Sequence, residues 1–406
     1  MALLPDAPWR HRPGFDRLCA LLGAADGETR LVGGAVRDGL LGLDVADIDL
    51  ATALIPEEVT QRLSAAGIKV VPTGIAHGTV TAVIDHRPVE ITTLRSDVST
   101  DGRRATIAYT DDWRDDAARR DFTINALYAD PATGEIYDYF GGLEDLAARC
   151  VRFIGDPAQR IAEDHLRILR YFRFLARFGA LPPDAAAYAA CRANANSLMA
   201  LSRERIADEL LKLLALPDPV AVLRLMVEGG IFAPVLPEID STGLKRLEAL
   251  LEKEREAGLD TPPSAVLRLA ALLPPDTAAG EQVAARLKLS NKARKRIVAA
   301  LTPPPAHASA QELVYRLGTE AALDLMLLDR AEMPREIAAL QHWNPPGFPL
   351  SGRDIIALGV SAGPDVATLL STSKEQWITE GFPDQNRAHA IAQLLVADFL
   401  RERQNS

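Results

Sequence analysis

The fold is decided by the stretch Leu31-Val32-Gly33-Gly34-Ala35-Val36-Arg37-Asp38 and by Asp47-Ile48-Asp49-Leu50 shortly after it. An apolar run that ends in two glycines predicts a strand, a tight turn and the start of a helix. The glycines leave bare backbone N–H groups beside the positive end of that helix, where phosphate oxygens are stabilised by hydrogen bonds and by the helix dipole. Gly33 and Gly34 are therefore candidate residues for binding a triphosphate.

Asp47 and Asp49 come next and lie two residues apart. In a strand such residues point to the same side, about 6.6 Å apart at Cα. Carboxylates so placed can bridge two hard cations about 3.5–4 Å apart, the arrangement used for in-line phosphoryl displacement. Ile48 should point into the core. A glycine pair alone is often a plain turn, and Asp-x-Asp alone is often a solvated edge, but their order and spacing together favour the functional interpretation.

Composition narrows the classes of protein that fit. The chain has 406 residues and a formal net charge of −10, which argues against indiscriminate nucleic-acid binding but allows a specific RNA ligand on a basic face. Three cysteines without a CxxC pair fit a reducing cytoplasm and no zinc site. The N-terminus does not have the pattern of a signal peptide, and no apolar run of about 18 residues predicts a membrane span. No protein partner is evident.

The predicted fold class is α+β, with a small mixed α/β head followed by helices. The expected strands are residues 29–33, 47–51, 79–85 and 88–94, with helices at 36–41 and 56–66 between them. Residues 85–88 are expected to form a hairpin connection. From about Leu143 the spacing becomes helical, with helices predicted at 163–178 and 202–214. Proline-rich breaks suggest four domains: a head (1–140), a neck (141–215), a body (216–300) and a tail (301–406).

Four further segments complete a recognisable series. They are Arg119-Arg120-Asp121-Phe122-Thr123-Ile124-Asn125-Ala126, Asp138-Tyr139-Phe140-Gly141-Gly142-Leu143-Glu144-Asp145-Leu146, Glu163-Asp164-His165-Leu166-Arg167, and Ser202-Arg203-Glu204-Arg205-Ile206 with Glu209. With the first two segments they resemble, in order, the motifs of the polymerase-β nucleotidyltransferase superfamily. More narrowly, they resemble the branch that holds class II tRNA CCA-adding enzymes and bacterial poly(A) polymerases. The resemblance spans residues 31 to 215, slightly under half of the chain.

This resemblance implies a reaction and its partners. The family adds CTP and ATP to the tRNA 3′ end without a template, and here Asp47 and Asp49 would hold Mg²⁺ as catalytic and metal-binding residues. It also implies that the second motif contacts ribose and triphosphate. The nucleotide-binding candidates are Gly33, Gly34, Arg37, Arg120, Asp121, Asn125, Asp164, Arg167 and Arg170. Arg37 with Asp38 can instead brace the turn, and Asn125 can instead hold the local fold.

Asp164 and Arg167 are the candidate base-selecting pair. Three residues apart on a helix, they would share a face, and an acceptor beside a planar donor fork can present a fixed pattern to a base edge. The resemblance implies that they select CTP and ATP while Glu163 orients the arginine. An exposed i,i+3 salt bridge is the alternative interpretation.

The head contains two further candidates, Glu90 and residues 95–113. Glu90 alternates with apolar residues on a strand expected beside that of Asp47 and Asp49, where it is either a third catalytic carboxylate or a solvent-facing residue. Residues 95–113 are polar, lack a clear period and resemble the family's flexible loop, which implies a role in switching from C to A addition.

The C-terminal half contains two candidate RNA contacts. Residues 286–296 have six basic residues and no acidic one, so they could bind a phosphate backbone or form a solvated helix face. Residues 352–364 resemble a helix-turn-helix element, which fits either a backbone-binding turn or a structural one.

Two rival functions remain. A poly(A) polymerase would share the chemistry and use ATP alone, although Gly74 to Val80 is more similar to the CCA-adding pattern. A non-catalytic RNA-binding or nucleotide-sensing protein on the same fold is the second rival, and the intact Asp-x-Asp argues against it. A Rossmann dehydrogenase is excluded by the missing G-x-G-x-x-G.

Overall fold

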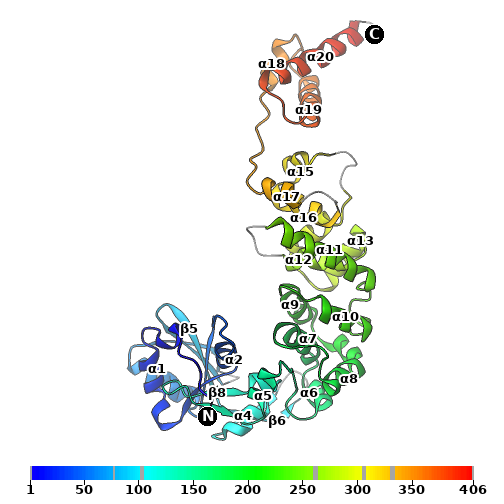
Figure 1. The fold of residues 1–406 in the computed structure, drawn as a ribbon. Coiled ribbons are helices and arrows are strands. Elements are labelled where there is room, and N and C mark those ends of the chain that lie inside the picture. Colours follow the sequence, from blue (N-terminus) through cyan, green and yellow to red (C-terminus); the bar gives the residue numbers. More distant parts are fainter. Residues whose placement is uncertain are drawn as a thin grey trace. The chain divides into compact units, whose positions relative to one another are not determined.

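The computed structural model describes residues 2–75, 78–100, 105–258, 264–303, 308–329 and 334–404. It forms two compact units, residues 1–237 and 238–406 (Figure 1). The first unit holds every strand of the described residues together with several helices, and the second is helical in its described part. The predicted α+β class is confirmed. The division into four domains stays a prediction, since the predicted head and neck both lie within the first unit.

A seven-stranded sheet forms the centre of the head. Its strands are, in spatial order, β3 (Lys69–Gly74), β4 (Thr79–Ile84), β5 (Arg87–Thr93), β2 (Ile48–Thr52), β1 (Thr29–Val32), β8 (Leu127–Ala129) and β9 (Ile136–Asp138). Only β2 and β5 pair in parallel among these. The predicted hairpin is confirmed, because Asp85 and His86 both have positive φ between β4 and β5, as a tight two-residue connection requires.

The strand–turn–helix start is also confirmed. Strand β1 ends at Val32, Gly33 adopts a φ of 67°, and α2 (Gly34–Leu40) begins at once. That positive φ is a region that L-residues with side chains rarely occupy, so glycine is needed at this turn. Ile48 is 2% exposed, as predicted for a core residue. The remaining helices of the head are α1 (Phe15–Leu21), α3 (Pro56–Ala65) and α4 (Trp113–Ala118).

Residues 95–113 contain structure that the sequence did not predict. β6 (Arg95–Thr100) pairs with β7 (Ala105–Tyr109) as a separate antiparallel ribbon. A two-stranded ribbon has no buried face that demands alternating apolar residues, which explains why no period was visible. Residues 101–104 of this segment lie outside the described residues.

The neck helices of the first unit follow the sheet. They are α5 (Gly142–Ala147), α6 (Pro157–Glu163), α7 (Arg167–Phe178), α8 (Ala185–Ala193) and α9 (Arg203–Leu214). Helix α10 (Val220–Glu228), from the predicted body, also lies in the first unit. The prediction of one helix over 163–178 is wrong, because α6 ends at Glu163 and Asp164 is extended. The Asp164 carboxylate accepts a hydrogen bond from the backbone N–H of Leu166 at 3.1 Å. Such a local bond competes with the helical pattern.

Aromatic packing joins the sheet region to α7. Phe122, just before the 3₁₀ turn Thr123–Asn125, has its ring centroid 5.0 Å from that of Phe153 and 5.1 Å from that of Phe174. Tyr171 stacks on Phe153 at 5.6 Å. Pairs at these distances add about 0.5–1.5 kcal/mol each to the burial of their area. The helix that carries Arg167 is therefore fixed against the segment that carries Arg120.

The second unit consists of short and long helices. They are α11 (Ser241–Ala257), α12 (Ala265–Leu272), α13 (Thr277–Arg286), α14 (Asn291–Ala300), α15 (Ala310–Leu317), α16 (Thr319–Asp329), α17 (Pro334–Leu340), α18 (Gly352–Ala357), α19 (Pro364–Thr379) and α20 (Gln385–Gln404). The predicted helix-turn-helix element is α18 and α19, packed on a core around Trp377. Across the described ranges, none of the helices is long and apolar enough to span a membrane.

Gly142 provides a test of packing between α5 and the Thr123 turn. A Cβ at this position would press on the carbonyl oxygen of Thr123 and lie 2.9 Å from its carbonyl carbon. Because backbone cannot move aside cheaply, we expect Gly142→Ala to lower the free energy of unfolding by about 1–3 kcal/mol. Gly347→Ala is the matched control, since nothing lies within 4 Å of its added Cβ. Chemical unfolding measures both, and equal stabilities of the two variants would contradict this packing.

Candidate functional site

A polar cavity of about 680 Å³ lies in the first unit, between the β1–α2 turn, the start of β2 and helix α7. Its lining residues are Gly33, Gly34, Arg37, Asp47, Asp49, Arg120, Asp121, Asn125, Asp164, Arg167, Arg170, Arg173 and Phe174. Every predicted site residue except Glu90 is among them. Arg173 and Phe174 were not predicted, although their three- and four-residue spacing from Arg170 places all three on one helix face.

The two candidate metal ligands sit at the edge of the sheet. Asp47 is exposed just before β2, and Asp49 is half-buried within it. Neither carboxylate accepts a hydrogen bond or forms an ion pair in the described part of the chain, although five arginines line the same cavity. Burial raises the pKa of Asp49 to about 6, and the negative charges of Glu90 and Asp47 add to this effect while Arg120 opposes it. Asp49 therefore carries a charge that the protein leaves uncompensated.

Glu90 lies beside this pair but outside the cavity lining. Its strand pairs in parallel with β2, and the register places Glu90 opposite Asp49, which confirms the predicted neighbouring strand. Its side chain is exposed, yet its charge is felt at Asp49. In the described residues, no group of three or more His, Cys, Asp or Glu side chains is arranged to hold a metal ion. The protein thus presents two carboxylates rather than a complete cage.

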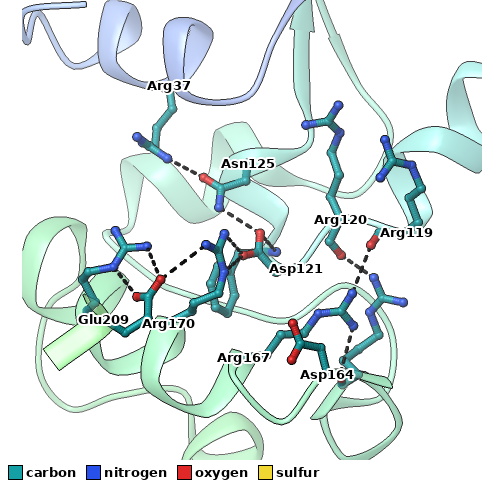
Figure 2. Close-up of polar contacts among 12 residues, drawn as sticks. Arg37, Arg119, Arg120, Asp121, Asn125, Asp164, Arg167, Arg170 and Glu209 are labelled. Atoms are coloured by element: carbon teal, nitrogen blue, oxygen red, sulfur yellow. Dashed lines mark hydrogen bonds and ion pairs between the residues drawn. The ribbon is translucent and has the colours of Figure 1, made fainter. Parts of the chain in front are cut away.

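A chain of hydrogen-bonded polar side chains runs along the cavity wall (Figure 2). Arg37 donates to the side-chain oxygen of Asn125, and Asn125 donates to Asp121 at 2.9 Å. Arg170 donates two hydrogen bonds to the other oxygen of Asp121, at 2.5 and 2.8 Å. Although burial opposes ionisation, the charge of Arg170 and these hydrogen bonds lower the pKa of Asp121. The carboxylate of Asp121 is thus committed to holding Arg170 and Asn125.

The chain continues to helix α9. Glu209, only 4% exposed, accepts from Arg173 at 2.6 Å and lies 3.7 Å from Arg170. At its other end, Arg37 also pairs with Asp38 at 2.7 Å and stacks over Phe178 at 4.0 Å. Arg37 and Asn125 therefore brace the turn, and both also line the cavity. Their role in binding a nucleotide stays a prediction.

Asp164 and Arg167 are held separately. Asp164 lies between α6 and α7, so the predicted shared helix face is wrong, and the two side chains do not form the alternative salt bridge. Asp164 accepts from Arg205 of α9 at 2.8 Å.

Arg167 has a different set of partners. It donates to Glu163 at 2.5 Å and to the carbonyl oxygen of Arg160 at 2.9 Å. The contact between Glu163 and Arg167 that the resemblance implied is therefore present. Asp164 and Arg167, the candidate selecting pair, are each held by different partners.

Three of the six basic residues between 286 and 296 form ion pairs with acidic residues of the second unit. Arg286 pairs with Glu238 at 2.8 Å, and Arg294 pairs with Glu281 at 2.9 Å. Arg296 pairs with Asp324 and Glu320, both at 2.5 Å. Contact between these arginines and an RNA backbone would have to compete with these ion pairs. The structure thus favours the solvated and paired helix face for three of the six basic residues.

The chain is similar to known protein families and to named relatives. Residues 29–152 match a model described as "Poly A polymerase head domain", and residues 182–242 match one described as "Probable RNA and SrmB- binding site of polymerase A". The mitochondrial CCA tRNA nucleotidyltransferase 1 of Mus musculus is 34% identical over 91% of this chain and 87% of its own length. The CCA-adding enzyme of Levilactobacillus brevis is 33% identical over 90% of this chain and 93% of its own length.

A solved structure is also similar. The CCA-adding enzyme of Bacillus stearothermophilus in complex with CTP superposes with a TM-score of 0.74 at 26% identity. The match covers 97% of this chain and 100% of that one.

The uncompensated charge of Asp49 predicts a pH-dependent stability. The pKa of Asp49 is about 6 in the folded state, whereas an aspartate ordinarily has a pKa of 3.8. The ionised carboxylate therefore destabilises the fold above about pH 6, and this effect disappears as the pH falls toward 3.8. In a buffer with a metal chelator at pH 7.5, we expect Asp49→Asn to raise the free energy of unfolding by about 1–2 kcal/mol. The gain should shrink at pH 4.5.

Urea unfolding at the two pH values measures this difference. The matched control is Asp44→Asn, since Asp44 is exposed in the loop that precedes β2 and lies outside the cavity lining. A variant Asp49→Asn that is no more stable than the wild type at pH 7.5 would contradict the prediction.

Proposed function

We propose an activity for this chain, which belongs to the family of CCA-adding tRNA nucleotidyltransferases: it adds or repairs the 3′-terminal CCA of tRNA. The reaction uses CTP and ATP without a template and releases pyrophosphate. The observation that carries the proposal is that Asp47 and Asp49 line the same cavity as Asp164 and Arg167, together with four further arginines. During transfer, a nucleotide must contact a metal site with its phosphates and a base-selecting site with its base. Both candidate pairs line this one cavity.

We propose Mg²⁺ as the metal, held by Asp47 and Asp49. The fit rests on their oxygen donors and on the absence of any other partner for these carboxylates in the described residues. Mg²⁺ prefers such hard donors, and it is commonly bound by one or two carboxylates together with substrate phosphates, which suits a site without a third ligand. When bound, the metal neutralises charge on the phosphates and promotes ionisation of the attacking hydroxyl. Glu90 is placed where it can add negative charge to this end of the site.

The protein's own residues position the triphosphate. Four aspartates and five arginines line the cavity, so its side chains alone supply a net charge of only +1 (5 − 4). Arg120 and Arg170 are directed at the cavity by acidic partners, and the backbone at Gly33 and Gly34 leaves room for phosphate oxygens. Positioning and charge neutralisation supply most of the rate in phosphoryl transfer.

Asp164 and Arg167 would read the base. Asp164 accepts hydrogen bonds and Arg167 donates them. Cytosine and adenine both present an amino group beside an unprotonated ring nitrogen, whereas uracil and guanine present a carbonyl oxygen beside an N–H. An acceptor next to a donor therefore fits the first two bases and leaves unpaired groups against the others. This gives a physical reason for using CTP and ATP only.

A poly(A) polymerase remains the second candidate, favoured by the description of the matching head model. Residues 76 and 77, within the segment that separates the two families by sequence, lie outside the described residues. We propose a cytoplasmic location, in line with the unpaired cysteines; some of the similar proteins are mitochondrial.

Nucleotide incorporation on a tRNA without its 3′ end tests the proposal. With CTP and ATP together we expect two C additions, one A addition and then a stop, read as product length on a gel. Asp47→Ala and Asp49→Ala should abolish incorporation without loss of fold, because the metal loses its ligands. A long A ladder from ATP alone would establish the poly(A) alternative, and no incorporation by the wild type would favour a non-catalytic protein.

The ion pair between Arg205 and Asp164 predicts that Arg205 helps the protein to discriminate between nucleotides. Arg205 holds Asp164, so Arg205→Gln should let the carboxylate rotate and raise the ratio of UTP to CTP incorporation by about 10-fold, the effect of about 1.4 kcal/mol. Lys212→Gln is the matched control, since Lys212 lies on the same helix, pairs with Asp208 and lies outside the cavity lining. Single-nucleotide kinetics measure both variants. An unchanged ratio in Arg205→Gln would show that Asp164 needs no such support.

A further inference from the structure

Asp116 of α4 is a buried carboxylate with an unusual number of partners. It is 1% exposed. One oxygen accepts from Arg119 at 2.8 Å and from the backbone N–H of Arg95 at 3.3 Å. The other accepts from Arg120 at 3.1 Å and from the hydroxyl of Tyr128 at 2.7 Å. Burial would raise the pKa of Asp116, but the charges of Arg120 and Arg119 outweigh it and lower the pKa to about 2.

These partners belong to two different parts of the head. Arg120 lines the cavity. Arg95 is the first residue of β6. The base of the β6–β7 ribbon lies at this point, because the N–H of Thr110, just after β7, donates a hydrogen bond to the carbonyl oxygen of Leu94 at 3.1 Å. Asp116 is therefore the side chain that connects the base of the ribbon to an arginine of the site.

The connection extends to the selecting residues. The backbone oxygen of Arg119 accepts from Arg167 at 3.4 Å, and that of Arg120 accepts from Arg160. Arg160 and Arg167 share Glu163. Figure 2 shows Arg119 and Arg120 directly above Arg167 and Asp164. A shift of the Arg119–Arg120 segment would therefore move the partner of the base-reading arginine.

We propose that Asp116 is a positioning residue that couples the β6–β7 ribbon to Arg119 and Arg120, and that its carboxylate thereby sets the preference between CTP and ATP. The proposal rests on the proposed function. It assigns the coupling to one buried group that touches the ribbon base and both arginines at once. A purely structural role for Asp116 would instead affect both nucleotides equally.

The test is the ratio of kcat/KM for ATP on tRNA ending in CC to kcat/KM for CTP on tRNA lacking CCA. Asp116→Asn keeps the shape of the side chain and removes its charge. Because the ribbon segment is implied in the switch to A addition, we expect the ratio to fall by about 10-fold or more. Asp115→Asn is the matched control, since it makes the same chemical change at an exposed position of the same helix that lies outside the cavity lining, and its ratio should stay within about 2-fold.

Two further variants separate coupling from loss of fold. Asp116→Glu keeps the charge that neutralises the arginines but lengthens the side chain, so it should fold and still lower the ratio. The second is a shortened ribbon in which Asn-Gly replaces residues 97–107 and joins the paired Ser96 and Ala108. If Asp116 acts through the ribbon, adding Asp116→Asn to this variant should change the ratio no further.

These measurements distinguish failure of the Asp116 coupling from failure of the proposed function. Equal losses for both nucleotides in Asp116→Asn and Asp116→Glu, or additive effects with the shortened ribbon, would overturn the coupling. A wild-type protein that incorporates neither nucleotide would overturn the proposed function and this proposal together. Wild-type incorporation of C and A with an unchanged ratio in both Asp116 variants would overturn this proposal alone.

Discussion

The arrangement of the site depends on charge compensation between the sheet region and the neck helices of the first unit. Asp121 follows α4 and Glu209 belongs to α9, and Arg170 of α7 lies against both of them. Taking these groups out of water is costly unless their geometry is satisfied. Once satisfied, the ion pairs leave Arg170 little freedom. The cavity is therefore bounded by arginines that are already in place before a nucleotide arrives.

This constraint explains why so many acids accompany the arginines of a site that is proposed to bind a polyanion. An unpaired arginine would attract phosphate more strongly but would lose side-chain entropy when it became ordered. Asp121 and Asp116 reduce the net charge of the wall and in return orient Arg170 and Arg120. The same reasoning applies to Arg167, which Glu163 orients. Preorganised donors of this kind cost little reorganisation during the reaction.

Local patterns in the sequence predicted the parts of the fold that local physics determines. The Gly33 turn, the Asp85–His86 hairpin and the α3 helix follow from turn chemistry and helix-start rules. The strand of Glu90 was expected beside that of Asp49, whereas the register that places the two residues opposite each other comes from the structure. The break at Asp164 was missed because one side-chain bond to Leu166 outweighs helical spacing. The spacing of Asp116 from Arg119 and Arg120 was a local signal that was overlooked, whereas its contacts with Arg95 and Tyr128 and the pairing of Arg173 with Glu209 depend on the fold. The pairing of Arg286, Arg294 and Arg296 likewise depends on acids that a count of basic residues ignores.

The contrast between the acids of the first unit is the most direct guide to its chemistry. Asp116 and Asp121 have lowered pKa values because arginines and hydrogen bonds surround them, whereas the pKa of Asp49 is raised by burial beside other carboxylates. Arg120 opposes the rise in the pKa of Asp49, but its ion pair is with Asp116. The fold leaves Asp49 without such a partner among the described residues, at a cost in stability that a bound cation can offset. For the proposed function, Asp49 is therefore the carboxylate whose charge a bound cation would offset.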